Sequence, residues 1–155
     1  MADLVNLGDM LPAMRETLDA GGEVSFVSKG RSMLPMLRDG VDTVILKKPT
    51  FPLKRYDIPL YIRKNDKFVL HRIIAIKDGK YIIRGDNCTY IETDIRDENV
   101  VAVLCGFIRN GKKYSVDNFF YKLYSRVYSS ELFYFFHKRA IPKLKRIVKK
   151  IIHRQ

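Results

Sequence analysis

Three residues in this chain have side chains that together can turn an alcohol into a nucleophile. Ser32 lies in the segment 29–35 (KGRSMLP), His71 follows 39 residues later, and Asp86 stands in the tripeptide 85–87 (GDN). A hydroxyl, an imidazole and a carboxylate are the groups that an activated serine requires. If the fold brings these groups together, the sequence predicts a serine peptidase.

The setting of each residue is compatible with that chemistry. Ser32 is expected on a loop that leaves a strand, where backbone N–H groups can face a developing oxyanion. His71 interrupts an apolar strand, so its imidazole needs a polar partner. Asp86 follows the next strand and is the first candidate for that partner. Glu92 and Asp94 lie close enough in the sequence to compete for the same role.

The middle of the chain reads as a compact, mainly antiparallel β body. Short β-branched and aromatic runs alternate with turn signals, and Asp78-Gly79 between two runs is typical of a β-hairpin. No long helical pattern separates the runs, which argues against a parallel sheet. The expected strands are Val24–Val27, Thr43–Leu46, Ile58–Ile62, Phe68–Ile76, Tyr81–Ile83 and Val100–Ile108.

Helical periodicity appears only toward the two ends of the chain. Residues 5–19 predict an amphipathic helix, and residues 117–136 and 138–153 predict two more. The composition changes near Asn110-Gly111. We therefore expect an N-terminal helix (1–22), a β domain (23–110) and a helical tail (111–155).

The charge of the chain is concentrated in that tail. The whole chain carries a formal +12, and residues 112–155 hold twelve Lys/Arg against only Asp117 and Glu131. Such a tail attracts polyanions, either an anionic membrane surface or nucleic acid. No apolar run is long enough to span a bilayer, and Asp3 and Asp9 interrupt any signal peptide. A cytoplasmic location is expected, with attachment to the inner membrane face as an alternative.

Cofactors and metals are not expected. The two cysteines, Cys88 and Cys105, form no CxxC pair and no cluster at metal-ligand spacing, so reduced thiols are predicted. Cys88 lies two residues after Asp86 and is expected near the site, although not as the nucleophile.

The combined motifs resemble the signal peptidase family and its self-cleaving repressor relatives. The resemblance covers residues 24–108 and rests on three segments: Gly30-x-Ser32-Met33-x-Pro35 with Arg38-Asp39-Gly40, then 71–74 (HRII), then 84–87 (RGDN). It implies a coiled antiparallel β-sheet or partly open barrel with a shallow substrate groove. It also implies cleavage after small residues, with His71 as the base, as in members of the histidine-base type.

The resemblance also assigns further residues. Gly30, Met33 and Pro35 belong to the nucleophile box and are expected to form the substrate and oxyanion pocket. Asp94 is the nearest match to a second aspartate that histidine-type members carry. The chain departs from the family where Tyr56-Asp57 replaces Gly-Asp, where Arg31 precedes the serine, and where the acidic helix 5–19 replaces a membrane anchor.

The sequence therefore predicts a serine endopeptidase that removes a signal or leader segment from a precursor peptide. Ser32 is the nucleophile, His71 the base, and Asp86 or Asp94 the orienting carboxylate. The alternative is an inactive peptidase fold that acts as a binding module, with its basic tail on a membrane surface or on nucleic acid. Nucleic acid is the less favoured partner, because residues 1–22 supply only one helix, too little for a helix-turn-helix.

Overall fold

The computed structural model describes residues 7–130 and residue 134, which form a mainly β structure with two α-helices. The chain divides into two compact units, residues 1–118 and residues 119–155. The first unit contains every strand, and the second contains helix α2 (Phe119–Ser129). The helix expected over 138–153, and the end of the one expected over 117–136, lie outside the described residues.

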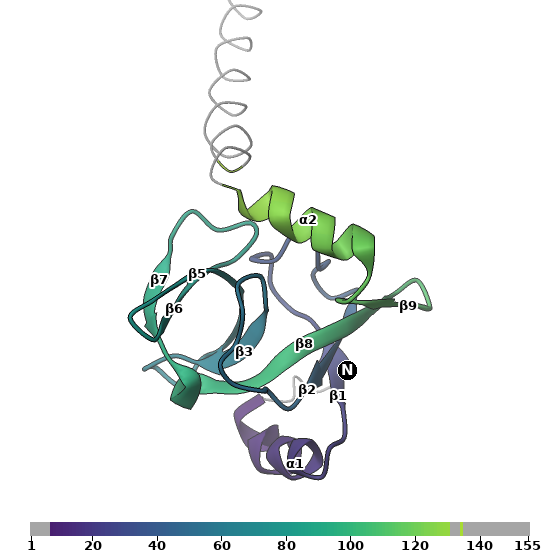
Figure 1. The fold of residues 1–155 in the computed structure, drawn as a ribbon. Coiled ribbons are helices and arrows are strands. Elements are labelled where there is room, and N and C mark those ends of the chain that lie inside the picture. Colours follow the sequence, from purple (N-terminus) through teal and green to yellow (C-terminus); the bar gives the residue numbers. More distant parts are fainter. Residues whose placement is uncertain (1–6, 131–133, 135–155) are drawn as a thin grey trace, which may run out of the picture. The chain divides into compact units, whose positions relative to one another are not determined.

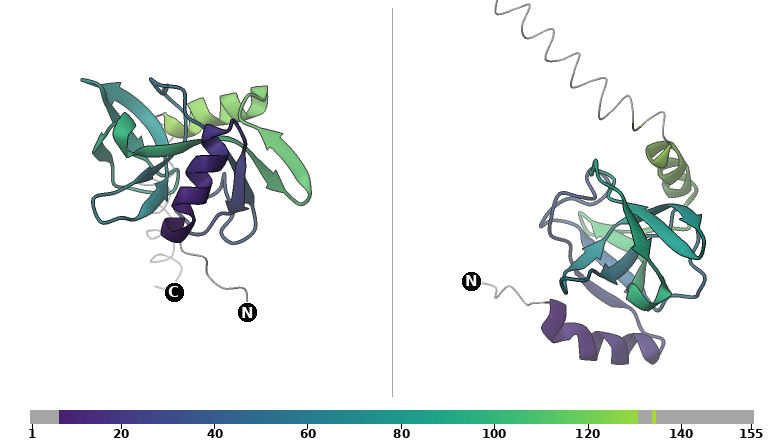
Figure 2. Two further views of the ribbon diagram at one scale, coloured as in Figure 1. Left: turned by 90° about the horizontal axis from the view of Figure 1, so that it is seen from below. Right: turned by 90° about the vertical axis from the view of Figure 1, so that its left-hand side faces the viewer.

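Helix α1 (Leu7–Asp19) confirms the amphipathic pattern that the sequence predicts. Its apolar stripe is buried at Met14 and Leu18, and it lies along the outside of the β body beside β1 (Figure 1 and Figure 2). The helix ends at Asp19, and Gly21 follows with a positive φ of 81° that suits glycine and donates its N–H to the Leu18 carbonyl at 3.0 Å. The turn thereby pairs one of the carbonyls that a helix end leaves without an intrahelical partner.

The larger sheet is organised around the ten-residue strand β8 (Val100–Arg109), which crosses the molecule in Figure 1. β8 pairs antiparallel with three neighbours, and the strand order is β1-β2-β8-β3-β4, with β9 also on β8. The other strands of this sheet are β1 (Val24–Val27), β2 (Thr43–Lys47), β3 (Pro59–Ile62), β4 (Phe68–Leu70) and β9 (Lys112–Ser115). β4 ends the path and is therefore an edge strand.

A second antiparallel sheet consists of β5 (Arg72–Lys77), β6 (Lys80–Arg84) and β7 (Glu92–Ile95). The predicted hairpin at Asp78-Gly79 is confirmed, with positive φ at both residues. β7 was not predicted, because only Ile95 of its four residues is buried. The two sheets give the curled, half-barrel appearance of Figure 1 and share one apolar core. Its buried members are Leu53, Tyr61, Ile73, Tyr81, Ile83, Ile95 and Val103.

The domain boundary expected near Asn110-Gly111 falls on a β-hairpin. These two residues form the turn of the β8–β9 hairpin, in which Arg109 faces Lys112. Both have positive φ, 50° at Asn110 and 76° at Gly111. Asn-Gly with two positive φ angles is a strong hairpin signal, and the change of composition at this point obscured it. Residues 111–118 therefore belong to the β unit and not to the tail.

The loop that carries Ser32, residues 28–42, is closed by a buried carboxylate. Asp42 is fully buried and accepts the Arg38 backbone N–H at 2.8 Å and the Arg109 Nη2 at 2.6 Å. The Arg38 Nη2 also donates to it at 2.9 Å. Burial alone raises the pKa of Asp42, but the hydrogen bonds from Arg109 and Arg38 outweigh it and lower the pKa to about 2. The Asp42 carboxylate thus holds the end of the loop in place.

Replacing Asp42 by Asn tests this closure. Because the folded-state pKa is lowered, the carboxylate stabilises the fold above its unfolded pKa of 3.8 and loses that effect as the pH falls through about 2. We expect Asp42→Asn to lower the free energy of unfolding by about 2 kcal/mol at neutral pH, measured by urea denaturation. The difference from wild type should shrink toward zero near pH 2.

The matched control is Asp66→Asn at an exposed turn, which should change stability by less than about 0.5 kcal/mol. A stability loss in Asp42→Asn that is the same at neutral and acid pH would show that shape, and not charge, is what the loop requires.

Candidate active site

His71 lies where the chain passes from one sheet to the other. The strand predicted over Phe68–Ile76 is broken at this residue: β4 ends at Leu70 in the larger sheet and β5 begins at Arg72 in the smaller one. His71 and Arg72 are both buried, with 1% and 0% of their surface exposed. A strand that changes sheets must bend at the junction, and the apolar pattern alone does not show the bend.

The Nδ1 atom of the His71 ring faces two oxygen atoms. It lies 3.3 Å from the Tyr61 hydroxyl and 3.3 Å from Glu92 Oε1. The Tyr61 hydroxyl itself donates to Glu92 Oε1 at 2.6 Å, so its oxygen accepts from the ring. This arrangement favours the tautomer with the proton on Nδ1, which leaves Nε2 as an acceptor.

Glu92 is held as a carboxylate by Arg63. The guanidinium donates from Nε to Oε2 at 2.8 Å and from Nη2 to Oε1 at 2.6 Å. Burial raises the pKa of Glu92, but the hydrogen bonds from Arg63 and Tyr61 outweigh it and lower that pKa below its usual value. The hydrogen bond to Glu92 raises the pKa of Arg63, and burial together with the hydrogen bond to Glu92 raises the pKa of Tyr61. At neutral pH, Glu92 is therefore negatively charged and Arg63 positively charged beside the imidazole.

The imidazole of His71 is neutral under the same conditions. Burial lowers its pKa below 6.5, and the positive charge of Arg63 lowers it further, while Glu92 acts in the opposite direction. A buried, neutral imidazole with its Nδ1 proton directed at a carboxylate is the resting state of a general base. When the ring takes a proton, Glu92 stabilises the imidazolium that forms.

The loop that carries Ser32 is hydrogen-bonded to the turn that follows β6. Asn87 N–H donates to the Ser32 carbonyl at 2.7 Å, and the Asn87 side-chain amide donates to the Arg31 carbonyl at 2.9 Å. Gly85 permits this approach, since a Cβ there would lie 2.7 Å from the Ser32 carbonyl oxygen and 2.9 Å from His71 Nε2. The absent side chain of Gly85 thus allows Ser32 and His71 Nε2 to lie on the same side of this turn.

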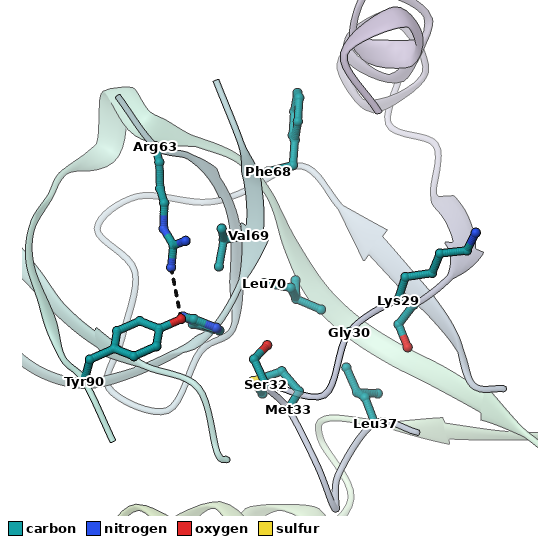
Figure 3. Close-up of a pocket in the computed structure, with 12 residues that line it drawn as sticks. Lys29, Gly30, Ser32, Met33, Leu37, Arg63, Phe68, Val69, Leu70 and Tyr90 are labelled. Atoms are coloured by element: carbon teal, nitrogen blue, oxygen red, sulfur yellow. Dashed lines mark hydrogen bonds between the residues drawn. The ribbon is translucent and has the colours of Figure 1, made fainter. Parts of the chain in front are cut away.

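Ser32 and His71 both line a pocket of about 180 Å³. Figure 3 shows the Ser32 hydroxyl directed into this pocket, with Phe68, Val69 and Leu70 along the opposite strand. Within residues 7–130 no hydrogen bond joins Ser32 Oγ to His71 Nε2. Free enzymes often hold this contact long and shorten it when substrate binds.

Cys88 also approaches the base. Its sulfur lies 4.0 Å from His71 Nε2 and 4.0 Å from the Ser32 carbonyl oxygen. The thiol is buried, with 8% of the residue exposed, and Cys88 does not line the pocket. Ser32 is half-buried and does line it, so a substrate in the pocket meets the hydroxyl and not the thiol.

Asp86, the first of the three carboxylates considered as the partner of His71, is engaged by Arg72 in this structure. Both Asp86 oxygens accept from Arg72, at 2.8 Å from Nε and 2.7 Å from Nη2, in a buried ion pair. Asp94 is exposed and pairs with Lys80 at 2.7 Å. Glu92 Oε1 lies 3.3 Å from His71 Nδ1, so Glu92 is the carboxylate placed to pair with this nitrogen.

Two of the three residues expected in the substrate and oxyanion pocket line the pocket in the structure. Gly30 and Met33 line the pocket, whereas Pro35 is exposed and does not. The Gly30 N–H donates to Asp39 Oδ1 at 2.8 Å, so it is already engaged. Within the described chain no hydrogen bond takes the Ser32 N–H, so this group is a candidate oxyanion donor.

Sequence reasoning missed Tyr61, Arg63 and Tyr90. Tyr90 lines the pocket and accepts a hydrogen bond from Arg63 Nη2 at 3.3 Å, the dashed line of Figure 3. Tyr61 and Arg63 come from the end of β3 and the residue after it, and no motif marks them. Only the pairing of Tyr61 with Val69 on β4 brings them beside His71.

No protein-family model and no curated protein sequence matches this chain. Among the described residues, no group of three His, Cys, Asp or Glu side chains is arranged to hold a metal ion. No helix in that part of the chain is long and apolar enough to cross a bilayer. The geometry of the site is therefore the evidence for its chemistry.

The assignment of Glu92 as the partner of His71 predicts a titration. Measured by the NMR shifts of the ring protons, the pKa of His71 should lie below 6.5. Glu92→Gln should lower it further, because the carboxylate is what favours the charged ring. Asp94→Asn, the exposed control, should leave it unchanged. A larger fall in Asp94→Asn than in Glu92→Gln would contradict the assignment.

Proposed function

We propose that this protein is a serine endopeptidase in which Ser32 is the nucleophile and His71 the general base. The observation that carries the proposal is the imidazole held through Nδ1 by Tyr61 and Glu92, with Nε2 on the side of Ser32 in a shared pocket. The resemblance of the motifs to the signal peptidase family supports the same reading, with Glu92 in place of the expected aspartate.

The reaction has two covalent steps. Ser32 Oγ attacks a peptide carbonyl while His71 Nε2 takes its proton, and the Ser32 N–H stabilises the oxyanion. The protonated ring then gives its proton to the leaving amine, and an acyl group remains on Ser32. Water, deprotonated by the same nitrogen, releases the acyl group and restores the hydroxyl. Glu92 stays ionised throughout and stabilises the imidazolium in each step.

An extended peptide is the substrate that the pocket accommodates best. β4 ends the larger sheet, and its residues Phe68, Val69 and Leu70 line the pocket opposite Ser32. An edge strand offers backbone N–H and C=O groups to an added strand. Hydrogen bonds to these groups align the peptide bond with little dependence on the peptide's sequence. The favoured natural substrate is the leader of a specialised precursor peptide, and an ordinary signal peptide is the second candidate.

Cleavage assays test the proposal against both substrate classes. The full chain would be incubated with precursor peptides encoded near its gene, with synthetic signal peptides and with a library of peptides from digested proteome. New termini would be mapped by mass spectrometry. We expect Ser32→Ala to reduce cleavage by about 10⁴-fold or more, because Ser32 lines the pocket and the Cys88 thiol does not. Its far-ultraviolet circular dichroism should match wild type.

Cys88→Ala is the matched control, since it removes the other nucleophilic atom near Nε2. It should retain activity within about tenfold of wild type. Full activity in Ser32→Ala with loss in Cys88→Ala would replace the serine mechanism with a thiol mechanism. Cleavage that survives both substitutions would arise from a contaminant and would contradict the assignment.

A further inference from the structure

The second unit of the chain contains an exposed apolar stripe. In α2 four large side chains are exposed: Phe119 by 71%, Phe120 by 75%, Leu123 by 48% and Val127 by 46%. Their spacing places them on one side of the helix. The residues of α2 that are buried are serines, Ser125 and Ser129, so burial of the helix does not account for its large apolar side chains.

Basic residues border this stripe. Lys122 follows Phe119 by three positions, and Arg126 follows Leu123 by three, which places each one turn along from an apolar residue. Residues 119–155 hold ten Lys/Arg and a single acidic residue, Glu131. Apolar side chains on one face with cations along its border and a strongly basic surrounding sequence are the pattern of a helix that lies in the surface of an anionic membrane.

We propose that α2 docks this protein on an anionic bilayer, with Phe119, Phe120, Leu123 and Val127 in the acyl boundary. Lys122 and Arg126 lie at the level of the headgroup phosphates. Half of the exposed stripe is aliphatic, and Leu123 and Val127 cannot stack on bases. The stripe therefore fits lipid better than single-stranded nucleic acid, which uses aromatic stacking together with charge. Docking is independent of the peptidase chemistry and would hold for an inactive fold as well.

The absence of tryptophan from the chain allows a direct experiment. Phe119→Trp places a single fluorophore in the stripe of the full-length protein. With vesicles of equal parts phosphatidylglycerol and phosphatidylcholine, its emission should shift to the blue and be quenched by lipids brominated in the acyl chain. Pure phosphatidylcholine vesicles should give a much smaller shift, and added salt should weaken binding.

Ile76→Trp is the matched control, since Ile76 is 46% exposed on β5 of the other unit. Its emission should not change with vesicles. In co-sedimentation, Phe119→Ser with Phe120→Ser should lower the bound fraction by at least about tenfold. The corresponding double variant of the β unit, Val41→Ser with Ile76→Ser, should bind as wild type does.

Four results would overturn the proposal. The first is unchanged Phe119→Trp emission on anionic vesicles, and the second is an equal shift in Ile76→Trp. The third is a shift with a single-stranded oligonucleotide but not with vesicles, which would assign the unit to nucleic acid. The fourth is a blue shift that grows with protein concentration in the absence of vesicles, which would assign the stripe to self-association.

Discussion

The packing of the turn after β6 against the carbonyl of Ser32 is the contact on which the site depends. Gly85 allows the backbones to approach, and Asn87 donates to the Ser32 carbonyl at 2.7 Å. Between them Asp86 forms a buried ion pair with Arg72, the residue next to His71. One short turn thus holds both the loop that carries Ser32 and the segment that carries His71. Breaking a buried pair of this kind leaves an uncompensated charge, which typically costs about 3–5 kcal/mol.

This arrangement separates the residues that hold the site from those suited to its chemistry. Asp86 and Asn87 hold the backbone in place, while the charge that most favours a protonated His71 comes from Glu92 on β7. Arg63 keeps Glu92 ionised although it is partly buried, and burial keeps the imidazole neutral. The imidazole is therefore suited to act as a base at neutral pH.

Much of the fold was predictable because strand patterning is local. The runs at Val24–Val27, Thr43–Leu46 and Val100–Ile108 became strands within a residue of their expected bounds, since each alternates or is continuously buried. β7 and β9 were missed because most of their residues are polar, so they carry little apolar signal. The break at His71 was missed because both adjoining segments are apolar, and only the sheet topology separates them.

The candidate site was predictable in part for the same reason. Ser32, His71 and the tripeptide at 85–87 stand in recognisable motifs, but the partner of each side chain depends on strand register. Asp86 is nearer to His71 in sequence than Glu92, yet Arg72 takes both of its oxygens. Tyr61 reaches the ring because β3 pairs with β4, and Arg63 follows that strand directly. Such long-range contacts leave no mark on the local sequence.

The rate at which a fluorophosphonate modifies the full chain tests the central claim most directly, because it needs no knowledge of the substrate. If neutral His71 activates Ser32, one phosphonyl group should appear on Ser32 by peptide mass spectrometry. Its rate should rise with pH through a midpoint below 6.5, the direction in which burial moves the pKa of the ring. His71→Gln should remove that pH dependence together with most of the rate. Modification of Cys88 in place of Ser32, or a rate that does not change with pH, would contradict the account.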